Sequence, residues 1–196
     1  NEEGRIGQLW KCVTTSNNPI DGDVTVERYI PVSKRAFRFL TPGLTTSTPI
    51  RTNWQEGANI TDPNDYPHTS AVAGKNPNPG YGTHITGSQT GSNGFDATIT
   101  GNPSVFQFNA ASQSWAAIAN TDQKSLIAGE GYQIMIRGDR SRDLKINTPD
   151  HNATIIRATG TPATCSYTFN STNSVVRLGA STNDYSFIGN PFWSLV

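Results

Sequence analysis

The side chains that could do chemistry are scattered along this sequence of 196 residues. The three histidines, His68, His84 and His151, lie in unrelated contexts, and none belongs to the His-x-x-x-His pair of a helical zinc site. Glu56 and Glu130 could serve as the two acids of a glycosidase, but a chain of this size offers such a pair by chance. There is no Gly-x-Ser-x-Gly nucleophile motif. The sequence therefore predicts a protein that is not an enzyme and that has no catalytic residues.

One segment has the oxygen-rich character that calcium prefers. Asp62-Pro-Asn-Asp65 brings two carboxylates and an amide close together. It lacks the regular Asp spacing and the central Gly of an EF-hand loop, so a turn closed by Asx side chains is favoured over a metal site. Calcium is the one cofactor that the sequence leaves open.

The tripeptide Arg137-Gly-Asp139 is of the kind that integrins recognise. It continues into Arg140-Ser-Arg-Asp143 and lies between two expected strands. We therefore expect an exposed, charged hairpin loop without a receptor role.

A sugar-binding surface would need exposed aromatic rings beside polar side chains, because large rigid rings offer apolar area next to hydrogen-bonding groups. The candidates for such a glycan platform are Trp54, Tyr66, Tyr81 and Trp115.

Composition limits the class of protein. Only 15% of the residues are charged and the formal net charge is zero, so no overall field favours nucleic acid or an anionic membrane. The sequence has no apolar run of membrane-spanning length and no recognisable signal peptide, so signals for export would lie outside these residues. Cys12 and Cys165 match no metal spacing; two separate buried thiols are favoured over a disulfide between them.

Apolar and polar residues alternate along many short segments, as in half-buried strands. Residues 24–30 and 35–40 alternate on either side of Pro31, and we expect them to form a hairpin. Frequent Gly, Asn and Pro turns favour an all-β fold: a single module over residues 1–196, a largely antiparallel, jelly-roll-like β-sandwich with little helix. Further strands are expected at residues 81–86, 95–100, 104–108, 114–118, 132–137, 144–147, 153–158, 165–169, 175–178 and 185–188.

Two other features bear on the fold. Residues 59–80 hold several prolines and should form a long loop, of a kind that is often a binding or lid element. Gly129 and Gly131 would allow a sharp turn before the strand at residues 132–137. The predicted core includes Phe37, Phe39, Tyr132, Ile134, Ile136, Phe187 and Ile188.

Several segments together resemble a known family. They are Trp54-Gln-Glu-Gly57, residues 80–87, 93–96, 114–118 and 128–139, and the terminal Ser186-Phe-Ile-Gly-Asn-Pro-Phe192. Their order is similar to that in β-sandwich modules of large surface proteins of the Bacteroidota that the type IX secretion system exports. The resemblance implies an extracellular or cell-surface location and a sorting domain outside these residues.

The resulting expectation is a non-catalytic adhesion or scaffold module. Its partners would be the rest of its own polypeptide, neighbouring surface-protein molecules or glycans, and the secretion machinery through the sorting domain. The alternative is a carbohydrate-binding module of a secreted enzyme. Because Phe192–Val196 is an apolar strand signature after a Gly-Asn-Pro turn, we also expect it to pair with residues beyond Val196 or with a neighbouring molecule.

Overall fold

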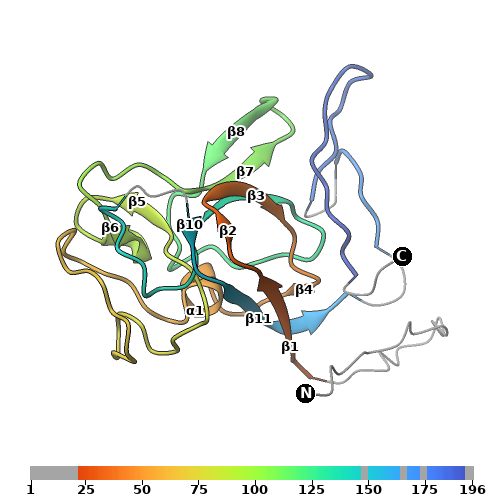
Figure 1. Cartoon of the computed structure of the whole chain (residues 1–196). Coiled ribbons are helices and arrows are strands. Elements are labelled where there is room, and N and C mark those ends of the chain that lie inside the picture. The colour runs from red at the N-terminus through yellow and green to blue at the C-terminus, as the bar shows by residue number, and fades with distance from the viewer. Residues whose placement is uncertain (1–21, 147–149, 164–166, 173–175, 193–196) are drawn as a thin grey trace.

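The computed structural model describes residues 22–146, 150–163, 167–172 and 176–192, and its regular secondary structure within these ranges is mainly antiparallel strands joined by long loops (Figure 1). Helical structure there is limited to α1 (Ile50–Trp54) and a short 3-10 turn (Ser92–Gly94). The prediction of an all-β, largely antiparallel, sandwich-like fold is confirmed. Both cysteines and Trp193–Val196 lie outside the described residues, so the expectations for them stay predictions.

The strands form two main sheets and two small pairs. The first main sheet has the order β1 (Val24–Ile30), β11 (Thr154–Pro162) and β4 (Leu44–Thr45). The second, called the four-stranded sheet below, has the order β3 (Ala36–Leu40), β9 (Tyr132–Ile136), β7 (Val105–Asn109) and β8 (Ser114–Ala117). The small pairs are β2 (Ser33–Lys34) with β10 (Asp150–His151), antiparallel, and β5 (Thr86–Ser88) with β6 (Asp96–Ala97), parallel.

Both main sheets contribute to one hydrophobic core. Alternate residues of β9, namely Tyr132, Ile134 and Ile136, are fully buried, as predicted. Ile156 of β11 belongs to the same cluster. The ring of Trp54, at the end of α1, meets Tyr132 edge-on with ring centroids 5.2 Å apart. The helix therefore fills the core beside the strands.

The expected hairpin between residues 24–30 and 35–40 is wrong. β1 pairs with β11 along its whole length, from Val24 opposite Gly160 to Ile30 opposite Thr154, whereas β3 pairs with β9. Between them, β2 pairs with β10. The reason is that β11 offers a partner residue for each of the seven residues of β1, a longer complementary strand than the five-residue β3 can provide.

The core prediction fails on β3. Phe37 and Phe39 are 44% and 62% exposed, whereas Leu40 is buried. Successive side chains of a strand point to opposite faces, so the inward position of Leu40 forces both phenylalanines onto the outer face of the four-stranded sheet. Ile188 is also exposed, and Phe187 is half-buried.

The other expected strands are found in part. Segments 104–108, 114–118 and 132–137 match β7, β8 and β9, and 153–158 lies almost wholly in β11, while segments 81–86 and 95–100 reach only the short β5 and β6. The described residues of segment 144–147 form a turn, because Asp143 accepts hydrogen bonds from the backbone N–H groups of Lys145 and Ile146. Segment 185–188 forms only a bridge between Ile188 and Glu130. Segments 165–169 and 175–178 fall partly outside the described residues.

Candidate functional site

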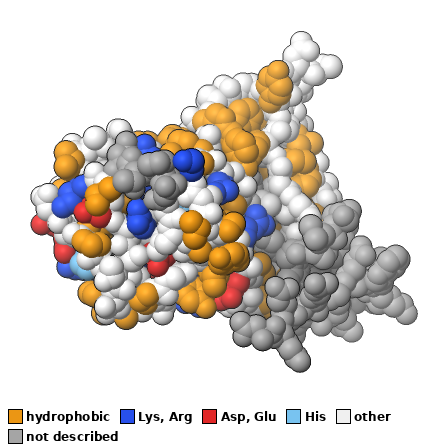
Figure 2. Space-filling model, in the orientation of Figure 1, with side chains coloured by type: hydrophobic (Ala, Val, Ile, Leu, Met, Phe, Trp, Pro, Cys, Tyr) orange, Lys and Arg blue, Asp and Glu red, His pale blue; other side chains and the backbone are white. Residues whose placement is uncertain are grey.

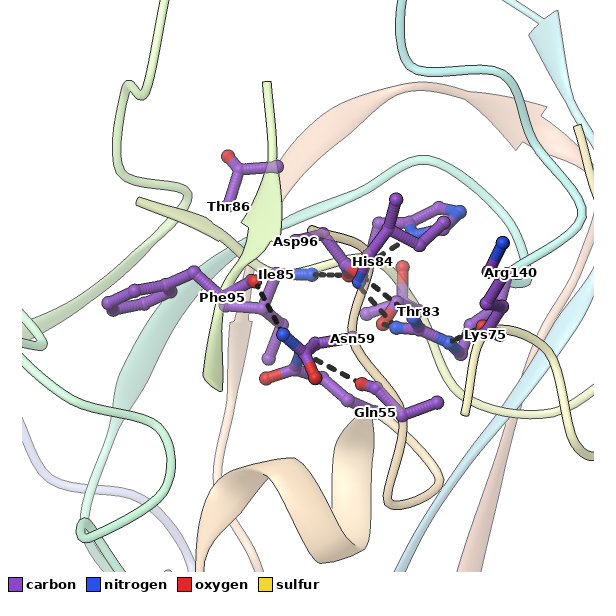
Figure 3. Close-up of polar contacts among 12 residues, drawn as sticks. Gln55, Asn59, Lys75, Thr83, His84, Ile85, Thr86, Phe95, Asp96 and Arg140 are labelled. Carbon is purple, nitrogen blue, oxygen red and sulfur yellow. Dashed lines mark hydrogen bonds and ion pairs between the residues drawn. The ribbon is translucent and has the colours of Figure 1, made fainter. Parts of the chain in front are cut away.

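Three titratable side chains, Asp96, His84 and Arg140, form a fully buried group, called the Asp96 cluster below (Figure 3). Arg140 binds Asp96 with both terminal nitrogens, Nη2 to Oδ1 at 2.7 Å and Nη1 to Oδ2 at 2.9 Å. His84 lies on the other side, with Nδ1 3.0 Å from Oδ2 of Asp96. None of the three side chains has any exposed surface.

The backbone completes the cluster. The carboxylate also accepts the N–H groups of Ile60 at 2.8 Å and Ile85 at 3.1 Å. The guanidinium donates from Nε to the carbonyl oxygen of Lys75 at 2.8 Å and from Nη1 to that of Thr83 at 3.2 Å. The cluster therefore ties the loop of residues 59–80 to β6 and to the turn after β9.

The charge state of the cluster follows from these contacts. Burial alone would raise the pKa of the Asp96 carboxyl, but the charge of Arg140 and the bond from His84 hold it well below its usual value. Burial lowers the pKa of His84 more than Asp96 raises it, so the imidazole is neutral near pH 7. In that state Nδ1–H donates to Asp96, and Nε2 has no hydrogen-bond partner among the described residues.

A His–Asp pair of this geometry could orient a general base, but a substrate would need a path to it. Because none of the three side chains is accessible to solvent, the Asp96 cluster holds the surrounding segments together by buried polar contacts. Close to the cluster, Gln55 Nε2 donates to the carbonyl oxygen of Gly94 at 2.9 Å. Sequence reasoning did not find the cluster, because its members share no motif spacing.

The buried neutral His84 predicts a stability loss in mild acid. The unfolded chain takes up this proton as the pH falls through about 6.5, whereas the folded chain resists it, so stability is full above that value and declines towards the lower folded pKa. Asp96, whose folded pKa is also lowered, adds a loss only below about 3.9. We expect the melting temperature to fall between pH 7 and pH 5 in thermal melts.

Two histidine variants test this origin of the pH dependence. His84→Asn keeps an N–H that can donate to Asp96 and should flatten the decline between pH 7 and pH 5. His68→Gln is the control, because His68 contacts Asp65 near the surface and not the Asp96 cluster. Equal slopes for wild type and His84→Asn would contradict the assignment.

The Arg-Gly-Asp tripeptide is not the exposed turn that the sequence predicts. Asp139 is only 5% exposed. Its carboxylate accepts the backbone N–H of Gly80 at 2.7 Å, Nδ2 of Asn152 at 2.7 Å and Oγ of Ser141 at 2.5 Å. Burial would raise the pKa of Asp139, but the bonds from Ser141 and Asn152 hold it below its usual value. Asp139 therefore fixes neighbouring loops instead of facing solvent.

The remaining candidate acids are held in separate contacts. Glu56 pairs with Arg157, with Oε2 and Nη2 2.5 Å apart. Glu130 pairs with Lys124 at 3.0 Å and accepts the hydroxyl of Tyr132. Each carboxylate of the proposed acid pair thus has its own cation.

The oxygen-rich segment 62–65 forms the favoured Asx turn. The backbone N–H of Asn64 donates to Oδ1 of Asp62 at 2.8 Å, and that of Asp65 donates to the carbonyl oxygen of Asp62 at 3.0 Å. No group of three His, Cys, Asp or Glu side chains that could hold a metal ion occurs among the described residues.

The four glycan-platform candidates are not brought together as one surface. Trp54 is 3% exposed and belongs to the core. Tyr66 is half-buried and donates its hydroxyl to the carbonyl oxygen of Ala97 at 3.2 Å. The ring of Tyr81 lies under the Arg157 guanidinium at 4.4 Å. Trp115 is 38% exposed and packs against other rings.

Trp115 belongs instead to a group of rings on the outer surface of the four-stranded sheet. Phe39 and Trp115 come from opposite edge strands, yet their rings stack at 5.8 Å with an interplanar angle of 18°. Phe187 lies against both, at 4.9 Å from each. Figure 2 shows hydrophobic side chains gathered over β7, β8 and the neighbouring C-terminal segment. The group, called the aromatic face below, comprises Phe37, Phe39, Phe106, Phe108, Trp115 and Phe187.

A sequence signal for the aromatic face does exist. Phe37 and Phe39 on β3, and Phe106 and Phe108 on β7, are each two residues apart and so share a face. The core residues Leu40 and Val105 of the same strands take the opposite face. Phenylalanines on the face opposite these core residues therefore indicate an aromatic outer surface on this sheet.

Comparison of the chain with protein-family models, with curated proteins and with solved structures finds no match. No helix among the described residues is long and apolar enough to cross a membrane.

Proposed function

We propose that this chain is a non-catalytic module of a secreted cell-surface protein of the type IX class, and that it acts in adhesion or as a structural scaffold. The observation that carries the proposal is the aromatic face. Its rings are uncharged, and Phe39, Phe37 and Trp115 keep much of their surface open. Aromatic residues at this density are typical of the buried centres of protein interfaces.

The polar chemistry of the chain supports the non-catalytic part. Asp96 and Arg140 bind each other and the surrounding backbone, and Asp139 is held by three neighbours. These side chains use their polar atoms to connect loops of the fold. The partner that suits the aromatic face is a neighbouring surface-protein molecule with an apolar surface of its own.

Attachment of the labelled chain to a surface coated with the same chain tests the proposal. We expect Trp115→Ala and Phe39→Ala each to reduce attachment several-fold, because each removes a ring from the aromatic face. Tyr29→Ala is the matched control, since Tyr29 is a ring on β1, in the other main sheet, and its exposed fraction of 65% is close to the 62% of Phe39. Undiminished attachment of both aromatic-face variants would refute the proposal.

The carbohydrate-binding alternative is favoured by one observation. The half-buried Gln133 of β9 lies opposite Phe39 and Phe106 in register, so an uncharged amide sits among the rings. Such a combination suits a neutral sugar. A glycan array tests this alternative. Binding of a specific glycan that Trp115→Ala abolishes and Tyr29→Ala leaves intact would favour carbohydrate binding over adhesion to protein.

A further inference from the structure

A second surface feature is a pocket of about 480 Å³ beside the small β5–β6 pair. It differs from the aromatic face because basic and hydroxyl side chains line it. Its walls come from the segment after β6, from the turn after β9 and from the residue between β2 and β3. Basic side chains and hydroxyls line it: Arg35, Arg137, Lys145, Thr86, Thr98 and Thr100. Figure 2 shows Lys and Arg side chains gathered on the face around β2 and β10.

Within the part of the chain that the structure describes, the two arginines of this pocket have no acidic partner. Among the described residues, no Asp or Glu lines the pocket, and neither Arg35 nor Arg137 forms a salt bridge. Nε of Arg137 is buried and has no hydrogen-bond partner there. Burial lowers the pKa of the Arg137 guanidinium, and the positive charge of Arg35 lowers it further. The two like charges are thus close enough to repel each other.

Three other arginines are each paired with an acid, whereas Arg38 of β3, outside the pocket, is half-buried, forms no salt bridge among the described residues and donates to Ser33 instead. Arg140 binds Asp96, Arg157 binds Glu56, and Arg51 binds Asp122. A buried or half-buried guanidinium without an anion is unfavourable, because desolvation is not offset by a counter-charge. The repulsion between Arg35 and Arg137 would be relieved by an anion that enters the pocket.

We propose that this pocket binds a tetrahedral oxyanion, the group presented by sulfate and phosphate esters. A dianion matches the two guanidinium charges, whereas a carboxylate supplies only one. Guanidinium groups donate paired N–H bonds to such oxygens, and the hydroxyls of Thr98 and Thr100 can donate to those that remain. Lys145 adds a third cation at the rim. The pocket volume lies within the range of small-ligand sites.

Isothermal titration calorimetry with inorganic sulfate and with inorganic phosphate tests the proposal. Chloride should hold the ionic strength constant, because general screening would otherwise mimic specific binding. We expect saturable heat with a dissociation constant in the millimolar range or below. Sulfate alone, phosphate alone or both giving heat would each support the site and would identify which ester its natural ligand carries. Heat from neither anion would overturn it.

Matched variants locate the binding. Arg137→Gln should weaken binding at least tenfold, and Arg35→Gln provides a second variant at a half-exposed position. Arg28→Gln makes the same charge change at an exposed position on β1 outside the pocket and should keep wild-type binding. Unchanged affinity in both pocket variants would overturn the proposal. In chloride alone, Arg137→Gln should not lower the melting temperature, since it removes a repulsion; a large fall would assign Arg137 a structural role instead.

Discussion

Asp96→Asn is expected to destabilise the fold by about 3–5 kcal/mol at pH 7, the usual effect of removing one partner from a buried ion pair. The variant leaves the Arg140 guanidinium buried without its counter-charge. It also weakens the acceptor for the backbone N–H groups of Ile60 and Ile85. A loss of this size is a large share of the total stability of an ordinary domain, which is about 5–15 kcal/mol. Urea denaturation monitored by tryptophan fluorescence would measure it.

The matched control makes the same chemical change at the surface. Asp122 pairs with Arg51, and both side chains are more than a third exposed. Asp122→Asn should therefore change the free energy of unfolding by no more than about 1 kcal/mol. Similar losses for the two variants would show that the Asp96 cluster is hydrated in solution.

The second large effect separates the two faces of the four-stranded sheet. Ile134→Ala should destabilise the fold by about 2–5 kcal/mol, because Ile134 is fully buried and its truncation leaves a cavity. Phe39→Ala on the neighbouring strand removes a larger side chain, but one that is mostly exposed. Its loss should stay within about 1.5 kcal/mol, the range of an aromatic contact.

Thermal melts of both variants would check this ordering. If Phe39→Ala lowered the melting temperature more than Ile134→Ala, the aromatic face would have to be covered in solution. Self-association at the protein concentration used would then be the first explanation to examine, and dilution would test it.

The fold class and the β9 core could be predicted because they depend on local alternation. The alternation of Tyr132, Ile134 and Ile136 with other residues indicates, within five positions, that these three share one face of the strand. The pairing of β1 with β11 could not be predicted, since it joins segments more than a hundred residues apart in sequence. Phe37 and Phe39 were wrongly predicted to lie in the core, because the hydrophobicity of a side chain does not show which face of its sheet is covered.

The long-range polar contacts could not be predicted from the sequence for a related reason, in contrast to the local Asx turn at Asp62. Asp139 looked solvated because its neighbours along the chain are charged, yet its partners Gly80 and Asn152 come from elsewhere. Arg140 lies next to it in sequence and reaches Asp96, another distant residue. Whether a charge is paired in the interior depends on three-dimensional proximity that no spacing rule encodes.

The attachment of Arg140 to the carbonyl oxygen of Lys75 has a consequence for how the molecule opens. The loop of residues 59–80 has little regular structure, and such segments usually unfold locally at small cost. Here the loop cannot detach without separating Ile60 from Asp96 and Lys75 from Arg140, and so without exposing an ion pair from the interior. Its buried, hydrogen-bonded amide protons, such as those of Ile60 and Asn76, should consequently exchange with solvent on the slow timescale of the sheets, as part of one cooperative unit.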